Sequence, residues 1–223
     1  MQLKVQPTCA VFGGSFNPLH AGHVGIVRAL AADAEVQTVL VVPARTSPFK
    51  RRDVLLPDAV RWAMLRAALR GLPGVAVSDV ELRRPGPSYT VDTLRTLAAQ
   101  LPAARLLFAL GWDAFAEFAK WNRAAEILSL AGLIVFDRAG AGREAPAQPE
   151  QWTRWLPPPR DAGARVHDGQ RLVTPEGRLL LRHLPLTLPA VAARDILAGR
   201  RLDDVPPGAR EVLAEHWRRA APA

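Results

Sequence analysis

Two glycines and two histidines near the start of the chain have the types and spacing expected of a phosphate-binding turn. Gly13 and Gly14 directly follow an apolar run, and His20 and His23 come a few residues later. Glycine lets the backbone turn sharply and approach a ligand closely, because no Cβ stands in the way. Imidazoles three positions apart share one face of a first helical turn, and a helix N-terminus favours anions. The segment therefore predicts a site for a phosphate group.

A buried strand and an amphipathic helix must hold this turn in place. The apolar run 8–12 predicts the first strand, and Val24, Val27 and Leu30 predict one apolar side of a helix. Pro18 lies between the two, near the beginning of the helix, and keeps the residue before it extended. The alternative is a strand–turn–helix whose histidines only cap or solvate the turn.

The stretch from Gly13 to His23 resembles the signature of nucleotidyltransferases that carry a His-x-Gly-His motif, and most closely that of bacterial nicotinate-nucleotide adenylyltransferases. The resemblance implies that ATP lies over Gly13, Gly14, Ser15 and Phe16. It also implies that His20 and His23, in their protonated form, contact the ATP phosphates as catalytic residues. A phosphate oxygen of nicotinate mononucleotide would attack the α-phosphorus of ATP, and pyrophosphate would leave without a protein nucleophile. We expect Mg²⁺ on the triphosphate, held mostly by phosphates and water.

Three further positions match the family's pattern around the mononucleotide. Lys50 ends a segment that resembles the family's Pro-His-Lys, with Phe49 in place of the histidine, and would put a positive charge near a phosphate. Tyr89 and Thr90 resemble the loop that accepts the nicotinate carboxylate at a helix start. Trp121 matches the aromatic residue that stacks on the pyridine ring. The alternatives are a solvated lysine, an ordinary N-cap at Thr90 and a tryptophan buried in the core.

Two further positions concern ATP. Asp113, in a Gly-x-Asp segment, would accept hydrogen bonds from ribose hydroxyls, or else cap a short helix. The family's Ile-Ser-x-Thr-x-x-Arg motif keeps only its arginine here, Arg194, which the resemblance makes the residue that grips the triphosphate. Pro189 and Val191 replace the two hydroxyl residues of the motif. Weaker ATP binding, compensation by Thr187, loss of activity and an exposed Arg194 without a role in binding all stay open.

The order of predicted elements indicates a single α/β domain over residues 1–223. Strands that alternate with helices predict a Rossmann-like, doubly wound and mainly parallel sheet with helices on both faces. The Pro/Gly/Ala-rich segment 139–177 is interpreted as a partly ordered surface insertion within the domain. Further strands are expected at 36–42, 75–77, 105–110, 133–136 and 179–181, and helices at 58–70, 91–101, 190–197 and 207–217, with another helical stretch around 112–122.

Composition restricts the partners and the compartment. The net charge of +8 comes mainly from scattered arginines, which fits small anionic substrates better than nucleic acid. No apolar run reaches the roughly 20 residues that a membrane-spanning helix needs. The start of the chain shows no signal-peptide pattern, and the single cysteine, Cys9, excludes an intrachain disulfide. We therefore expect a cytoplasmic protein that binds neither nucleic acid nor membrane, and the oligomeric state stays open.

These observations predict adenylyl transfer from ATP to nicotinate mononucleotide, which yields deamido-NAD and pyrophosphate in NAD biosynthesis. Transfer to nicotinamide mononucleotide or to phosphopantetheine is the alternative within the same enzyme class. A nucleotide-binding regulatory module with weakened catalysis is the alternative outside it.

Overall fold

The computed structural model describes residues 6–46, 55–137, 149–158, 163–186, 188 and 191–220. These residues form one eight-stranded sheet. Its strands are β1 Thr8–Gly14, β2 Thr38–Pro43, β3 Val75–Val77, β4 Arg105–Gly111, β5 Ala131–Phe136, β6 Arg165–His167, β7 Arg171–Val173 and β8 Leu179–Leu184. The strand order is β3-β2-β1-β4-β5-β8-β7-β6, in which only the β7 and β6 edge is antiparallel.

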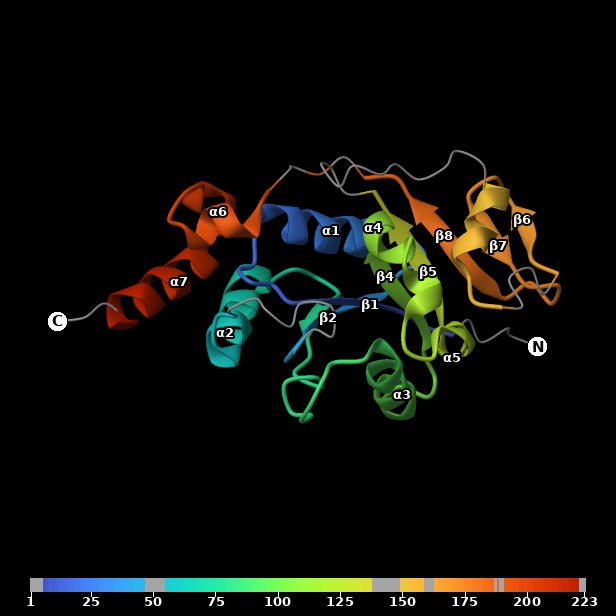
Figure 1. Cartoon of the computed structure of the whole chain (residues 1–223), viewed down its shortest axis with the longest axis horizontal. Coiled ribbons are helices and arrows are strands. Elements are labelled where there is room, and N and C mark those ends of the chain that lie inside the picture. The colour runs from blue at the N-terminus through green and yellow to red at the C-terminus, as the bar shows by residue number, and fades with distance from the viewer. Residues whose placement is uncertain are drawn as a thin grey trace.

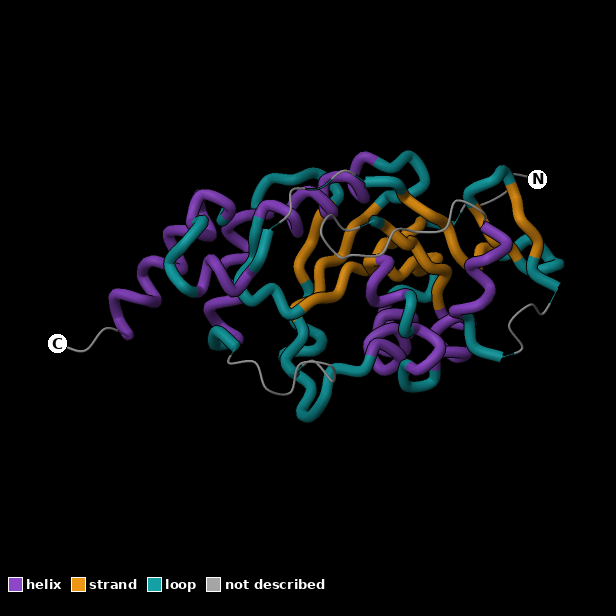
Figure 2. The backbone as a smooth tube through the Cα atoms, turned by 45° about the horizontal axis from the view of Figure 1, so that its top comes forward, coloured by secondary structure: helices purple, strands orange, loops and turns teal. Residues whose placement is uncertain are grey.

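Helices cover both faces of this sheet (Figure 1). They are α1 Ala21–Ala32, α2 Asp58–Leu69, α3 Thr90–Gln100, α4 Trp112–Phe115, α5 Ala124–Leu130, α6 Ala193–Leu197 and α7 Pro207–Ala220, with 3₁₀ segments η1 Phe118–Lys120, η2 Pro149–Trp155 and η3 Leu202–Asp204. Strands and helices alternate along most of the chain, and the strands lie together as one layer (Figure 2). The predicted doubly wound α/β fold is confirmed.

The central strands are apolar throughout because both of their faces are buried. In β1, Ala10 and Phe12 pack with α1, α2 and α7 on one face of the sheet. Cys9 and Val11 pack with α3 and α5 on the other face. Near-continuous apolar runs of this kind are typical of parallel sheets covered on both sides. Burial also raises the pKa of the Cys9 thiol, as expected for a small core residue.

The direction of winding reverses between β1 and β4. From β1 the sheet extends through β2 to β3 on one side, and through β4, β5 and β8 on the other. The carboxyl ends of β1 and β4, at Gly14 and Gly111, therefore lie beside each other with connections that leave in opposite directions. Doubly wound sheets bind their ligands at such a switch point.

The structure corrects several predicted boundaries. The first strand runs on to Gly14, because both glycines still pair with β2. Thr90 is not the N-cap of α3: Tyr89 is, since its carbonyl oxygen accepts the N–H groups of Asp92 and Thr93. The predicted helical stretch 112–122 is broken into α4 and η1, and α5 begins only after Arg123, which has a left-handed φ of 53°.

The described part of segment 139–177 contributes to the sheet and to the core. Strand β7 pairs with β8, and β6 pairs with β7. Trp152 of η2 and Leu172 of β7 are both buried in the core that covers one face of the sheet. Residues 138–148 and 159–162 lie outside the described residues.

Candidate nucleotide-binding site

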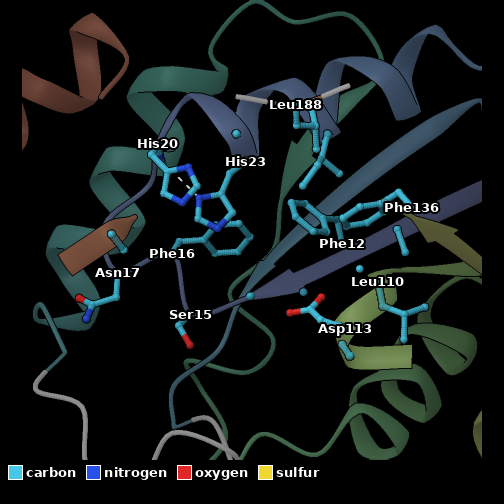
Figure 3. Close-up of a pocket in the computed structure, with 18 of the residues that line it drawn as sticks. Phe12, Ser15, Phe16, Asn17, His20, His23, Leu110, Asp113, Phe136 and Leu188 are labelled. Carbon is cyan, nitrogen blue, oxygen red and sulfur yellow. Dashed lines mark hydrogen bonds between the residues drawn. The ribbon is translucent and has the colours of Figure 1, made fainter. Parts of the chain in front are cut away.

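A cavity of about 470 Å³ lies at the switch point of the sheet (Figure 3). Phe12 and Gly13 line it from the end of β1, and Asp113 lines it from α4, directly after β4. His23 of α1 faces the same space, and Figure 3 shows Asp113 across the cavity from it. The size is typical of pockets for a small ligand such as a nucleotide.

The two histidines stack against each other at the beginning of α1. His20 is the N-cap residue, with extended backbone and only 3% of its surface exposed. The ring centroids of His20 and His23 are 3.8 Å apart, and the ring planes are tilted by 32°. The backbone N–H of His20 donates a hydrogen bond to Nδ1 of His23 at 3.3 Å. The helix start thus fixes the orientation of the His23 ring.

The contact to Nδ1 leaves the other ring nitrogen of His23, Nε2, on the side of the ring away from the His20 backbone. The contact between His23 and the ATP phosphates that the sequence leads us to expect stays a prediction.

The ring of Phe16 supports the glycine turn from beneath. Phe16 has a left-handed φ of 46°, which is uncommon for a bulky residue, and its side chain is 1% exposed. The ring stands edge-on to Phe12, at a centroid distance of 5.6 Å, and to His23, at 5.0 Å. A Cβ on Gly14 would come within 3.1 Å of this ring. A side chain at position 14 would therefore crowd the Phe16 ring, which favours glycine there.

The opposite wall of the cavity is acidic. Asp113 lies in the first turn of α4, and its Oδ1 folds back to 2.6 Å from where a Cβ on Gly111 would be. Glu117 follows one turn later and also lines the cavity. Among the described residues that line it, two are carboxylates, two are histidines and none is lysine or arginine. The described part of the chain also holds no group of three His, Cys, Asp or Glu residues suited to a metal ion.

Trp121 packs against the core and also lines the cavity, and its stacking on a pyridine ring stays a prediction. Its ring packs edge-on against Phe108, at a centroid distance of 6.1 Å, and lies 5.6 Å from that of Phe118. It is only partly buried, and it lines the cavity near Phe108. The core thus holds Trp121 in place, and part of the Trp121 ring borders the cavity.

Other predicted site residues do not border the cavity. Tyr89 and Thr90 form the beginning of α3 and are absent from its lining. Arg194 is exposed on α6, while the apolar Val191 and Ala193 line the cavity next to it. Lys50 lies outside the described residues.

The segment before α3 is nevertheless tied to the loop after β2. The Ser88 N–H donates to the carbonyl oxygen of Thr46 at 2.9 Å, and the Arg45 N–H donates to Ser88 Oγ at 3.1 Å. Beneath it, the buried Glu81 accepts a hydrogen bond from Thr93 Oγ1 at 2.7 Å, and burial raises the pKa of Glu81. These contacts hold the predicted carboxylate loop close to the exit of a central strand.

Sequence reasoning missed three polar residues of this region. Asn17 lies inside the recognised segment and lines the cavity, but no role was predicted for its side chain. Glu117 follows Asp113 by four residues, and this helical spacing could have predicted that the two carboxylates lie on the same side. Arg61 is fully buried on α2 and shares a face with Leu65 and Leu69 at intervals of four, a pattern in which a lone arginine stands out.

Comparison with known proteins agrees with this geometry. A family model described as cytidylyltransferase-like matches residues 11–176, which contain both the glycine turn and the acidic wall. Fold and site thus define a protein of the cytidylyltransferase-like class. No helix among the residues that the structure describes is long and apolar enough to span a membrane.

Individual relatives identify the family within this class. A protein of Laribacter hongkongensis, named a probable nicotinate-nucleotide adenylyltransferase, is 35% identical over 99% of this chain and 100% of its own length. One of Gloeobacter violaceus with the same name is 41% identical over 60% of this chain, a match that spans 65% of that relative. The chain belongs to the nicotinate-nucleotide adenylyltransferase family. In fold it also resembles the Plasmodium falciparum nicotinic acid mononucleotide adenylyltransferase complexed with NaAD, with a TM-score of 0.69 and 13% identity over 94% of this chain and 96% of that one.

Proposed function

We propose that the protein transfers the AMP group of ATP to nicotinate mononucleotide, which yields deamido-NAD and pyrophosphate in NAD biosynthesis. The observation that carries this proposal is the cavity at the switch point, where the Gly13–Gly14 turn and the oriented His23 face Asp113. Family membership supports the choice of substrates.

The reaction needs alignment and charge stabilisation. A phosphate oxygen of the mononucleotide forms a bond to the α-phosphorus, and the bond from that phosphorus to the leaving pyrophosphate breaks. Nε2–H of His23 donates to a phosphate oxygen as negative charge develops there, and the exposed backbone of Gly13 and Gly14 admits the phosphates closely. Because both reactants are held at one cavity, no protein nucleophile is required.

Magnesium fits this site as a companion of the triphosphate. Asp113 and Glu117 line the cavity with carboxylates, which are hard oxygen ligands, and Mg²⁺ commonly keeps water and phosphate oxygens as most of its ligands. When bound, the ion would neutralise phosphate charge beside an acidic wall. We also assign to Asp113, which lines the cavity, the role of accepting hydrogen bonds from the ribose hydroxyls of ATP.

The acceptor is assigned to the side of the cavity near Trp121. We assign the pyridine ring to the face of Trp121 that borders the cavity, and the nicotinate carboxylate to the helix start at Tyr89 and Thr90. Lys50 and Arg194 are assigned to phosphate groups. These roles, like a cytoplasmic location and action on small molecules without nucleic acid, are part of the proposal.

An acceptor panel tests the reaction. Pyrophosphate release is measured with ATP and magnesium, and nicotinate mononucleotide, nicotinamide mononucleotide and phosphopantetheine are supplied one at a time. We expect the highest kcat/KM with nicotinate mononucleotide. Preference for another acceptor would contradict the substrate assignment, and ATP binding without pyrophosphate release from any acceptor would contradict the reaction.

A further inference from the structure

Arg61 is a fully buried, charged residue directly behind the phosphate-binding turn. It lies on α2, and its side chain is 0% exposed. Removing a guanidinium from water is costly, so one that is buried must be well supplied with acceptors. The acceptors around Arg61 show what it holds together.

Its donors reach three separate stretches of backbone. Nη1 donates to the carbonyl oxygen of Ser15 at 2.8 Å and to that of Ala44 at 2.7 Å. Nε donates to the carbonyl oxygen of Leu56 at 3.1 Å, and Nη2 pairs with Asp58 Oδ1 at 2.5 Å. One side chain thus joins the turn after β1, the exit of β2 and the beginning of α2.

The same segments are also joined to one another. The Ala44 N–H donates to the carbonyl oxygen of Gly14 at 2.8 Å, and the Leu56 N–H donates to Asn17 Oδ1 at 2.8 Å. Gly14, Ser15 and Asn17 all belong to the turn that lines the cavity, and each is held by this network. Arg61 is its centre, because it contacts Ala44, Leu56 and the turn itself.

The Ser15 contact fixes the direction of a peptide group in the turn. In a trans peptide the C=O and the following N–H point in opposite directions. With the Ser15 oxygen held by Arg61, the N–H of Phe16 points away from the guanidinium. We propose that Arg61 is a positioning residue for the reaction: it orients the Ser15–Phe16 peptide so that this N–H faces the ATP phosphates. This role rests on the proposed adenylyl transfer.

Lysine cannot replace arginine in this role. The guanidinium is planar, keeps its charge and carries five N–H groups at fixed angles, so that it reaches acceptors in several directions. A lysine ammonium has three donors at a single point and would leave at least one of these carbonyl oxygens without its partner. The Arg61→Lys variant therefore keeps the charge and most of the volume but loses the geometry.

The test compares Arg61→Lys with Arg66→Lys, since Arg66 is exposed on the same helix. The dissociation constant of ATP is measured by calorimetry, together with kcat, both KM values and the melting temperature. For Arg61→Lys we expect ATP binding to weaken about tenfold, equivalent to about 1.4 kcal/mol. We expect the KM for nicotinate mononucleotide to stay within about twofold. Arg66→Lys should match the unsubstituted protein.

Several outcomes would overturn this role. A folded Arg61→Lys variant with unchanged ATP affinity and kcat would do so. So would a kcat that falls only in proportion to the folded fraction, because that is the result of a merely structural residue. If Arg61→Lys does not fold, Asp58→Asn weakens the orientation of the same guanidinium, and an unchanged ATP affinity there would refute the proposal. ATP affinity is read directly, so failure of the unsubstituted protein to use any acceptor would count against the reaction alone.

Discussion

Replacing Gly14 by alanine tests whether the Phe16 ring supports the Gly13–Gly14 turn. The added Cβ would lie 3.1 Å from Cζ and 3.3 Å from Cε2 of Phe16, closer than ordinary van der Waals contact. The ring has little room to yield, because it is buried and stands edge-on to both Phe12 and His23. Overpacking of this kind costs about 1–3 kcal/mol. For a domain of this length we therefore expect the melting temperature to fall by roughly 2–12 °C.

The neighbouring glycine is a matched control. A Cβ on Gly13 would lie 3.6 Å from the nearest ring atom of Phe108, which is ordinary contact. Gly13→Ala should change the free energy of unfolding by less than about 0.5 kcal/mol. Thermal unfolding followed by circular dichroism, without nucleotide, compares both variants with the unsubstituted protein. Equal losses in the two variants, or no loss in Gly14→Ala, would refute the reasoning about the Phe16 ring.

Three further predictions concern the site and its support. His23→Asn keeps an acceptor for the His20 N–H but has no group at the Nε2 position. Turnover should therefore fall by about 100-fold or more, with little change in melting temperature. Turnover near that of the unsubstituted protein would show that Nε2 is not used. Gly111→Ala should displace the Asp113 carboxylate, whose Oδ1 lies 2.6 Å from the new Cβ, and raise the KM for ATP by about threefold or more. The same change should have no further effect in an Asp113→Ala background, whereas additive effects would contradict this placement. Burial raises the pKa of Glu81, so the native state binds its proton more tightly than the unfolded chain does, and the contribution of this carboxyl group to stability should be lost as pH rises from about 4.3 through its raised pKa. Glu81→Gln removes this contribution, and a melting temperature with the same pH dependence in both proteins, measured from about pH 4 to 8, would refute it.

The sequence contained enough to predict the centre of the site. Gly13, His23, Asp113 and Trp121 are distant in the chain, yet all line one cavity. The reason is topological: parallel strands place their carboxyl ends at one edge of the sheet, so residues that directly follow buried strands converge there. Alternating apolar segments therefore predicted the fold and the position of the histidines at the end of the first strand, whereas Asp113 and Trp121 were predicted from the family resemblance.

Other features of the site depend on individual hydrogen bonds, which the spacing of apolar residues does not reveal. The orientation of the His23 ring depends on a single backbone hydrogen bond, and the role proposed for Arg61 depends on carbonyl groups on three separate segments. Arg194 matched a motif by register, yet it is exposed on α6 while Val191 and Ala193 line the cavity. Loop and helix-terminal positions of this kind are set by local backbone geometry, and a residue pattern alone does not fix it.

A crystal structure with a non-hydrolysable ATP analogue tests the central claim most directly. We predict that the triphosphate lies over the Gly13–Gly14 turn, with Nε2 of His23 within hydrogen-bond distance of a phosphate oxygen and the ribose beside Asp113. An analogue bound elsewhere, or a His23 ring whose Nε2 faces away from the phosphates, would contradict the account.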